Sequence, residues 1–187
     1  MSNLGRRKFM IMSSTATAAW MLSMDRSEAA NSLFNRIPRE WLKVHGRQVY
    51  DYARYIENLR LRRIDTMAVL KPHFNVRGKV RNIIPPKSMW RNISSTLRVA
   101  DKLSQVLRKD VKGVTSVYRS PSYNRMVGGK SRSYHMRNNA LDIQFDCSPY
   151  HAARVARSMR NRGYFRGGVG DYSGFIHIDT RGHNVDW

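Results

Sequence analysis

The chain has 187 residues, of which 41% are hydrophobic, and it carries a net charge of +21. This length favours a single domain with an appendage, and the hydrophobic content excludes disorder throughout the chain. The charge predicts an anionic partner, such as a nucleic acid, an anionic membrane or an acidic cell-wall polymer. The alternative is a soluble domain with an arginine-rich face. Cys147 is the only cysteine, which excludes a disulfide within the chain and a cysteine-based zinc site.

Residues 1–30 have the pattern of an export signal. Arg6 and Arg7 precede a weakly apolar segment that runs to Met24, and small residues follow at a suitable cleavage position. The arginine pair resembles the twin-arginine export signal. The apolar segment is shorter than the roughly 20 apolar residues of a comfortable membrane span, although an uncleaved anchor and a cytoplasmic amphipathic start remain alternatives. We therefore predict a periplasmic or extracellular protein with no stable membrane span after removal of the signal.

Residues 31–85 are predicted to form a basic, largely helical region followed by a linker. Apolar residues recur there at helical spacing, with basic residues between them: Val49, Tyr52, Ile56 and Leu59. Residues 65–87 are less regular and contain a short extended piece. We place the start of the core domain at Pro86, so that this domain spans residues 86–187.

The core domain alternates between helical and extended patterns. In chain order we expect a helix over 88–107 with Ser88 as its N-cap, a strand over 114–119, a loop over 120–129, a strand over 140–145, a helix from Ser148 to the C-cap Gly163, a flexible approach over 167–170, and a last pair of strands ending with 175–179. This order predicts an α+β fold with a small, mostly antiparallel sheet flanked by helices.

His135, Asp142 and His177 are candidate metal ligands. A turn at Asn138 places His135 in a loop and Asp142 on the adjoining strand, so that the two converge across the turn. Two imidazoles and one carboxylate form a common ligand set for a catalytic zinc with one open position. Asp179 shares a strand face with His177, where it would accept the second ring N–H of a ligating histidine or contact bound water. The alternative is that these are polar residues of turns and a strand with no metal.

Several short motifs occur in order through residues 86–187: Tyr118-Arg119-Ser120-Pro121, Val127-Gly128-Gly129, Ser133-x-His135, Ala140-x-Asp142, Gly168-x-Gly170-x-Tyr172 and Phe175-Ile176-His177-Ile178-Asp179. Together they resemble the zinc D-alanyl-D-alanine carboxypeptidases, in the wider group that includes lysostaphin-type endopeptidases and the hedgehog signalling domain. The resemblance implies a hedgehog/DD-peptidase-like fold in which His135, Asp142 and His177 bind Zn²⁺. It also implies that Arg119 faces the substrate carbonyl or carboxylate, whereas an ion pair with a carboxylate of the protein is the alternative for this residue.

Two features depart from the family pattern. Asn138 stands where members usually carry a glycine, and asparagine tolerates the left-handed conformation better than most residues. Relatives of known activity place a histidine two residues before the last zinc histidine, or a glutamate three before it; here these positions hold Phe175 and Gly174. Asp179 and Asp171 are the nearby carboxylates that remain.

Our primary hypothesis is an exported zinc metallopeptidase that hydrolyses peptide bonds in peptidoglycan, as a D,D-carboxypeptidase or an endopeptidase. Arg119 and Asp179 are its catalytic candidates, peptidoglycan peptides are its expected partners, and the basic surface favours anionic envelope polymers as well. The unmatched base motivates an alternative, which is a catalytically inactive, zinc-stabilised cell-wall-binding module. A third hypothesis, a basic nucleic-acid binder, rests on charge alone and lacks a nucleic-acid motif, so no nucleic-acid partner is expected.

Overall fold

The computed structural model describes residues 33 and 35–187, and Ile37–Trp187 form one compact unit. The predicted export signal in residues 1–30 lies outside the described residues. Within the described part of the chain, no helix has both the length and the apolar character needed to cross a membrane. The compact unit includes residues 37–85, so this region packs with the rest of the unit, while the division of the chain at Pro86 stays a prediction.

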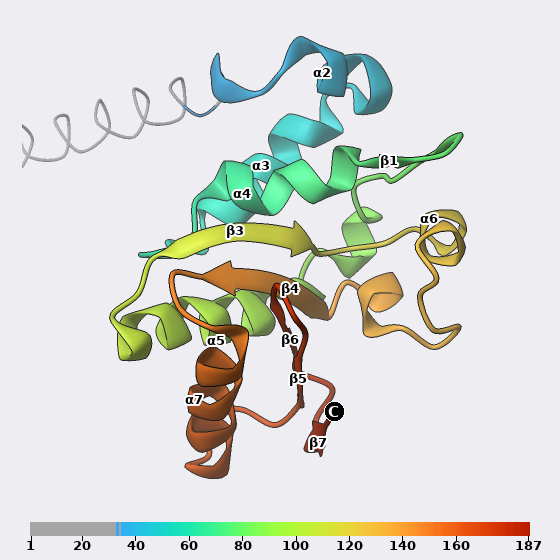
Figure 1. Cartoon of the computed structure of the whole chain (residues 1–187). Helices are drawn as coiled ribbons and strands as arrows, with labels where there is room; N and C mark the ends of the chain where they lie inside the picture. Colours follow the sequence, from blue (N-terminus) through green and yellow to red (C-terminus); the bar gives the residue numbers. More distant parts are fainter. Residues whose placement is uncertain (1–32, 34) are drawn as a thin grey trace, which may run out of the picture. The chain divides into compact units, whose positions relative to one another are not determined.

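A five-stranded sheet forms the centre of the unit (Figure 1). The strand order is β3-β4-β6-β5-β7, and neighbours pair antiparallel except for β5 and β7, which pair parallel. The expected α+β class with a small, mostly antiparallel sheet is confirmed. The strands are β3 (Val111–Ser116), β4 (Ala140–Phe145), β5 (Gly168–Asp171), β6 (Ile176–Asp179) and β7 (Val185–Asp186).

Helices α5 (Asn92–Leu107) and α7 (Pro149–Asn161) lie together on one face of the sheet (Figure 1). Each helix buries an apolar stripe against the strands. The buried side chains between these helices and the sheet are Ile93, Leu97, Leu103, Ala152, Ala156, Met159, Leu141, Ile143, Ile176 and Ile178. Ser148 caps α7 as predicted, because its side chain accepts a hydrogen bond from the backbone of His151 at 3.3 Å. Gly163 follows the end of α7 with a φ of +83°, a conformation that suits glycine.

The predicted N-cap Ser88 is wrong. Lys87–Met89 form a separate 3₁₀ turn, η2, and α5 begins only at Asn92. The Trp90 indole N–H donates to the carbonyl of Pro85 at 2.9 Å, which holds the chain in a turn before the helix starts. The helical spacing of apolar residues therefore begins before the helix itself does.

The predicted loop over 120–129 is also wrong in part, because it contains helix α6 (Pro121–Met126). The Ser120 side chain accepts from the backbone of Tyr123 at 3.2 Å, and proline occupies the first turn. The preceding strand, β3, ends at Ser116 rather than at residue 119. The segment from Val117 to Ser120 is thereby released from the sheet and carries Arg119 towards the candidate site.

The region before the sheet consists of short elements that pack against β3 through α4 and η1. They are α2 (Arg39–His45), α3 (Gln48–Glu57), α4 (Thr66–Leu70), η1 (Lys71–Phe74) and the hairpin strands β1 (Val76–Arg77) and β2 (Val80–Arg81). Asn82 is fully buried after this hairpin, and its side chain donates to the carbonyls of Pro72 and Tyr118 at 3.1 and 2.8 Å. The same side chain accepts from the backbone of Ser120 at 3.0 Å. Asn82 thus anchors the segment that carries Arg119.

Candidate metal centre and its pocket

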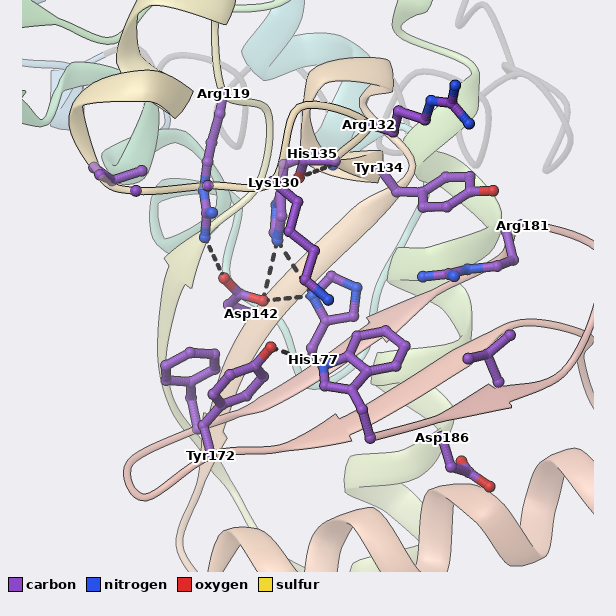
Figure 2. Close-up of a pocket in the computed structure, with 17 residues that line it drawn as sticks. Arg119, Lys130, Arg132, Tyr134, His135, Asp142, Tyr172, His177, Arg181 and Asp186 are labelled. Atoms are coloured by element: carbon purple, nitrogen blue, oxygen red, sulfur yellow. Dashed lines mark hydrogen bonds and ion pairs between the residues drawn. The ribbon is translucent and has the colours of Figure 1, made fainter.

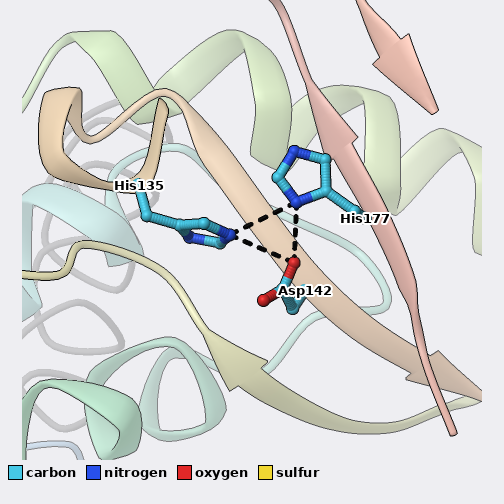
Figure 3. A group of neighbouring side chains, drawn as sticks. All are labelled: His135, Asp142 and His177. Atoms are coloured by element: carbon cyan, nitrogen blue, oxygen red, sulfur yellow. Dashed lines mark hydrogen bonds and ion pairs between the residues drawn. The ribbon is translucent and has the colours of Figure 1, made fainter. Parts of the chain in front are cut away.

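His135, Asp142 and His177 converge in the structure (Figure 3). Asp142 on β4 and His177 on β6 are direct partners in the strand register, and His135 reaches them from the 3₁₀ turn η3 (Tyr134–Arg137). His135 Nε2 lies 3.1 Å and His177 Nδ1 lies 2.8 Å from the same oxygen, Asp142 Oδ1. The two ring nitrogens are 3.3 Å apart, and all three side chains are buried.

The His135 ring is oriented by the backbone that follows β3. Its Nδ1 lies 2.6 Å from the carbonyl oxygen of Val117. A carbonyl only accepts, so Nδ1 carries the proton and Nε2 presents its lone pair towards Asp142. The turn itself is fixed at both ends: Ser133 accepts from the backbone of His135 at 3.3 Å, and Arg119 N–H donates to the His135 carbonyl at 3.2 Å. Backbone contacts therefore select the nitrogen that His135 offers to a metal.

A buried carboxylate orients the His177 ring. Asp179 is fully buried, and its Oδ2 lies 3.2 Å from His177 Nε2, on the side of the ring away from Asp142. Burial would raise the pKa of Asp179, but hydrogen bonds from His177 and Arg181 hold this pKa well below its usual range. The ionised carboxylate accepts, so Nε2 carries the proton and Nδ1 presents its lone pair to Asp142 and His135.

Asp179 is in turn saturated by donors. Arg181 Nε lies 2.8 Å from Oδ1 and 3.0 Å from Oδ2, and Nη2 lies 2.5 Å from Oδ2. The backbone N–H groups of Gly168 and Arg181 donate to Oδ1 at 3.0 and 3.1 Å. Of the two roles expected for Asp179, the geometry matches the acceptor of the His177 N–H, because Oδ2 lies 3.2 Å from Nε2 and the remaining donors occupy both carboxylate oxygens.

Arg119 is bound to the metal-site carboxylate. Its Nη2 lies 2.5 Å from Asp142 Oδ2, the oxygen that faces away from the two histidines, and its Nε donates to Ser116 Oγ at 2.7 Å. Ser116 Oγ also lies 3.4 Å from His135 Nδ1. This arrangement is the ion pair that the sequence left open as the alternative for Arg119. It leaves Oδ1 as the Asp142 oxygen that points at the histidines.

The charges of the cluster suit a bound cation. Burial would raise the pKa of Asp142, but His135 and His177 hold it well below its usual range. Burial lowers the pKa of His135, whereas for His177 the carboxylates of Asp142 and Asp179 outweigh burial and raise the pKa. When both rings are neutral, as metal binding requires, their outer partners set the tautomers so that two nitrogen lone pairs and one anionic oxygen meet at a single point. Such a set fits Zn²⁺, which binds imidazole nitrogens and carboxylate oxygens.

The cluster lies in the wall of an open pocket of about 570 Å³ (Figure 2). Its other charged and aromatic lining residues are Arg119, Lys130, Arg132, Arg181, Asp186, Tyr134, Tyr172, Phe175 and Trp187. Asp186 is the only lining carboxylate besides Asp142 among the described residues, and it is paired with Arg157 and Arg160 at 3.1 and 2.7 Å. A ligand that enters this pocket therefore meets mainly cations and aromatic rings.

Trp187 covers the His177 ring, with ring centroids 5.1 Å apart, and its indole N–H donates to Tyr172 Oη at 2.7 Å. Two glycines of β5 make room for it. A Cβ added to Gly170 would lie 2.4 Å from the Trp187 indole nitrogen, and one added to Gly168 would lie 2.9 Å from the ring. The Gly168-x-Gly170-x-Tyr172 motif thus has a steric role, which is to seat an aromatic ring over a candidate metal ligand.

The positions that departed from the family pattern have clear structural counterparts. Asn138 has a φ of +52°, so the expected left-handed residue is confirmed. Phe175 lines the pocket and stacks on Tyr172 with centroids 4.6 Å apart. Asp171 is not part of the pocket lining and pairs with Arg157 at 2.7 Å. Neither of the two remaining carboxylates therefore occupies the place of the missing base.

Two residues of the site were not singled out from the sequence: Arg181 and Lys130. Arg181 stacks its guanidinium on Tyr134, 4.2 Å from the ring centroid, and on Trp187 at 5.1 Å, while it holds Asp179. A basic residue two positions after Asp179 was the available signal for this role. Trp187 closes the run of family motifs in the sequence, and it reaches the site through the parallel β5–β7 pairing.

An α+β domain with two imidazoles and one carboxylate meeting in an open pocket defines a candidate mononuclear metal centre. A match to the family Peptidase M15 spans residues 75–179, more than half of the chain and all three candidate ligands. The chain belongs to the Peptidase M15 family, whose peptidases depend on zinc. No curated protein and no solved structure matches the chain.

Proposed function

We propose that the protein is an exported zinc metallopeptidase that hydrolyses peptide bonds in peptidoglycan. The observation that carries this proposal is the convergence of His135 Nε2, Asp142 Oδ1 and His177 Nδ1, each with its orientation set by an outer partner, in a pocket of an M15-family chain. Export rests on the pattern of residues 1–30.

His135, Asp142 and His177 would hold the zinc. When bound, the metal supplies an activated water and polarises the scissile carbonyl. Val117, Asp179 and Arg119 act as positioning partners: the carbonyl of Val117 and the Asp179 carboxylate fix the two ring tautomers, and Arg119 restrains Asp142. Arg119 and Asp179 thus belong to the working site through the ligands that they orient.

The pocket suits a short peptide with anionic groups. Arg119, Lys130, Arg132 and Arg181 line it with positive charge, and its aromatic rings offer apolar contact area. Peptidoglycan stem peptides carry free carboxylates, so they are the proposed substrates, and cleavage takes the form of D,D-carboxypeptidase or endopeptidase action. The net charge of +21 favours anionic envelope polymers as additional partners.

A specific observation favours a second candidate, a zinc-stabilised cell-wall-binding module without catalysis. Phe175 occupies the place of the usual base, and the pocket carboxylate Asp186 is held by Arg157 and Arg160. A water at the centre would then lack a carboxylate to take its proton. This candidate predicts binding to sacculi with no change in their peptides.

The experiment is muropeptide analysis of sacculi after incubation with the zinc-loaded protein. We expect shortened stem peptides for carboxypeptidase action, or conversion of crosslinked dimers to monomers for endopeptidase action. His135→Ala should abolish the change, and His151→Ala, at an exposed histidine of α7, should preserve it. Unchanged muropeptides with zinc-loaded wild-type protein that still binds sacculi would support the binding module instead.

A further inference from the structure

The pocket contains a cation that neither the metal ligands nor their positioning partners use. Arg119 is committed to Asp142 and Ser116, and Arg181 is committed to Asp179. Lys130 lines the same pocket, is exposed, and forms no ion pair with any residue in the described part of the chain. In Figure 2 its side chain extends into the pocket in the direction of Asp142 and His177, whereas the guanidinium of Arg132 points away from them.

The backbone of Lys130 is firmly held, although its side chain has no ion-pair partner within residues 33 and 35–187. Asn124 Nδ2 and the backbone N–H of Ser133 both donate to the Lys130 carbonyl at 3.0 Å. Gly129 packs against Asn124 so closely that a Cβ there would lie 2.1 Å from Asn124 Oδ1. These contacts fix the point from which a flexible ammonium reaches into the pocket.

We propose that Lys130 is a catalytic residue whose ammonium stabilises the negative charge on the scissile carbonyl oxygen during peptide hydrolysis. The inference rests on the proposed function and assigns to Lys130 the role that the sequence had given to Arg119. Hydrolysis creates an oxyanion, and Lys130 is the cation of the pocket that is directed at the cluster and has no carboxylate partner in the described residues.

The chemistry needs only substrate and water. The water oxygen bonds to the carbonyl carbon, and the carbonyl electron pair moves onto the carbonyl oxygen. The electron pair then returns to re-form the C=O bond of the new carboxyl group as the C–N bond breaks, and the leaving amine nitrogen takes a proton from that water. Lys130 acts by charge and hydrogen bonding, which an arginine at the same position can partly replace.

The test is calorimetric binding of a phosphinate pseudopeptide to the zinc-loaded protein, because a phosphinate carries the tetrahedral anion in place of the scissile amide. A version with an amidated C-terminus removes the competing carboxylate. Lys130→Ala should weaken this binding about 100- to 1,000-fold, as the loss of an oxyanion donor does. Lys130→Arg should retain most of the affinity, and Lys112→Ala, which removes an exposed charge of β3 outside this pocket, should leave it unchanged.

Unchanged phosphinate affinity in Lys130→Ala would overturn the proposal. So would a loss seen only with the free-carboxylate version, since that result makes Lys130 a carboxylate anchor. In wild-type protein that cleaves sacculi, Lys130→Ala should lower kcat with little effect on KM. If the zinc-loaded wild type does not cleave at all, the proposed function fails, while the calorimetric comparison still decides the role of Lys130.

Discussion

His177 is held between two carboxylates, with Asp179 Oδ2 at 3.2 Å from Nε2 and Asp142 Oδ1 at 2.8 Å from Nδ1. The sheet register explains this placement: Asp142 is the cross-strand partner of His177, and Asp179 lies two residues further along β6 on the same face. One carboxylate belongs to the candidate metal centre, and the other decides which ring nitrogen faces it.

Asp179→Asn should therefore weaken zinc binding without removing a ligand. The neutral amide no longer favours a protonated His177 Nε2, so the ring loses part of its fixed orientation, and we expect a loss of about 10- to 100-fold in affinity. Competition with a chromophoric chelator measures it. Asp171→Asn changes a carboxylate that pairs with Arg157 and is not part of the pocket lining, so it should bind zinc as wild type does. Equal affinities in the two variants would contradict the positioning role.

Gly170→Ala should dislodge Trp187 from the His177 ring. The new Cβ would lie 2.4 Å from the indole nitrogen, so the ring must move, and we expect destabilisation of about 1–3 kcal/mol in urea unfolding. In a Trp187→Ala background the same substitution should cost much less, because nothing occupies that space. Equal costs in both backgrounds would show that the glycine is required for another reason.

Asn138 should prefer glycine to alanine as a replacement. Its φ is +52°, and its side chain donates to the Met89 carbonyl at 3.0 Å. Both replacements lose the hydrogen bond, but only alanine adds left-handed strain, so Asn138→Gly should be more stable than Asn138→Ala by about 1 kcal/mol. The opposite order is expected at Ser158, an exposed site within α7. Urea unfolding of the four variants tests the reversal.

His73 should make the fold sensitive to acid. Burial lowers the pKa of this fully buried histidine from 6.5 to about 4. As the pH falls, His73 therefore takes up a proton at a higher pH in the unfolded chain than in the folded protein. The contribution of neutral His73 to the free energy of unfolding is complete above pH 6.5 and is lost as the pH falls towards 4. The shift corresponds to a loss on the order of 3 kcal/mol. His73→Phe should show a shallower decline of unfolding free energy over this range, and parallel curves would contradict the assignment.

Local sequence signals predicted the parts of the fold that depend on local physics. The alternating pattern of residues 140–145 gave β4 at its observed bounds, and Ser148 with Pro149 gave the start of α7. The same Ser-Pro signature at Ser120 begins α6, where we predict a loop from the sequence. The signal was present in both places, and only its interpretation differed.

The sequence predicted the metal ligands of the candidate site but not all of the residues that surround and position them. His135, Asp142 and His177 could be proposed from residue type and order. The contacts of Arg181 and Trp187 depend on which strands pair and in which register, and these pairings join residues far apart in the chain. The position of Lys130 likewise depends on how the segment around Gly129 packs against Asn124.

The most direct test of the account is a zinc titration of the metal-stripped chain. We predict one zinc per chain, with binding lost in each of His135→Ala, Asp142→Ala and His177→Ala and retained in His151→Ala. Absence of stoichiometric zinc binding by the wild-type chain, or equal binding by wild type and the three ligand variants, would contradict the assignment of this cluster as the metal centre.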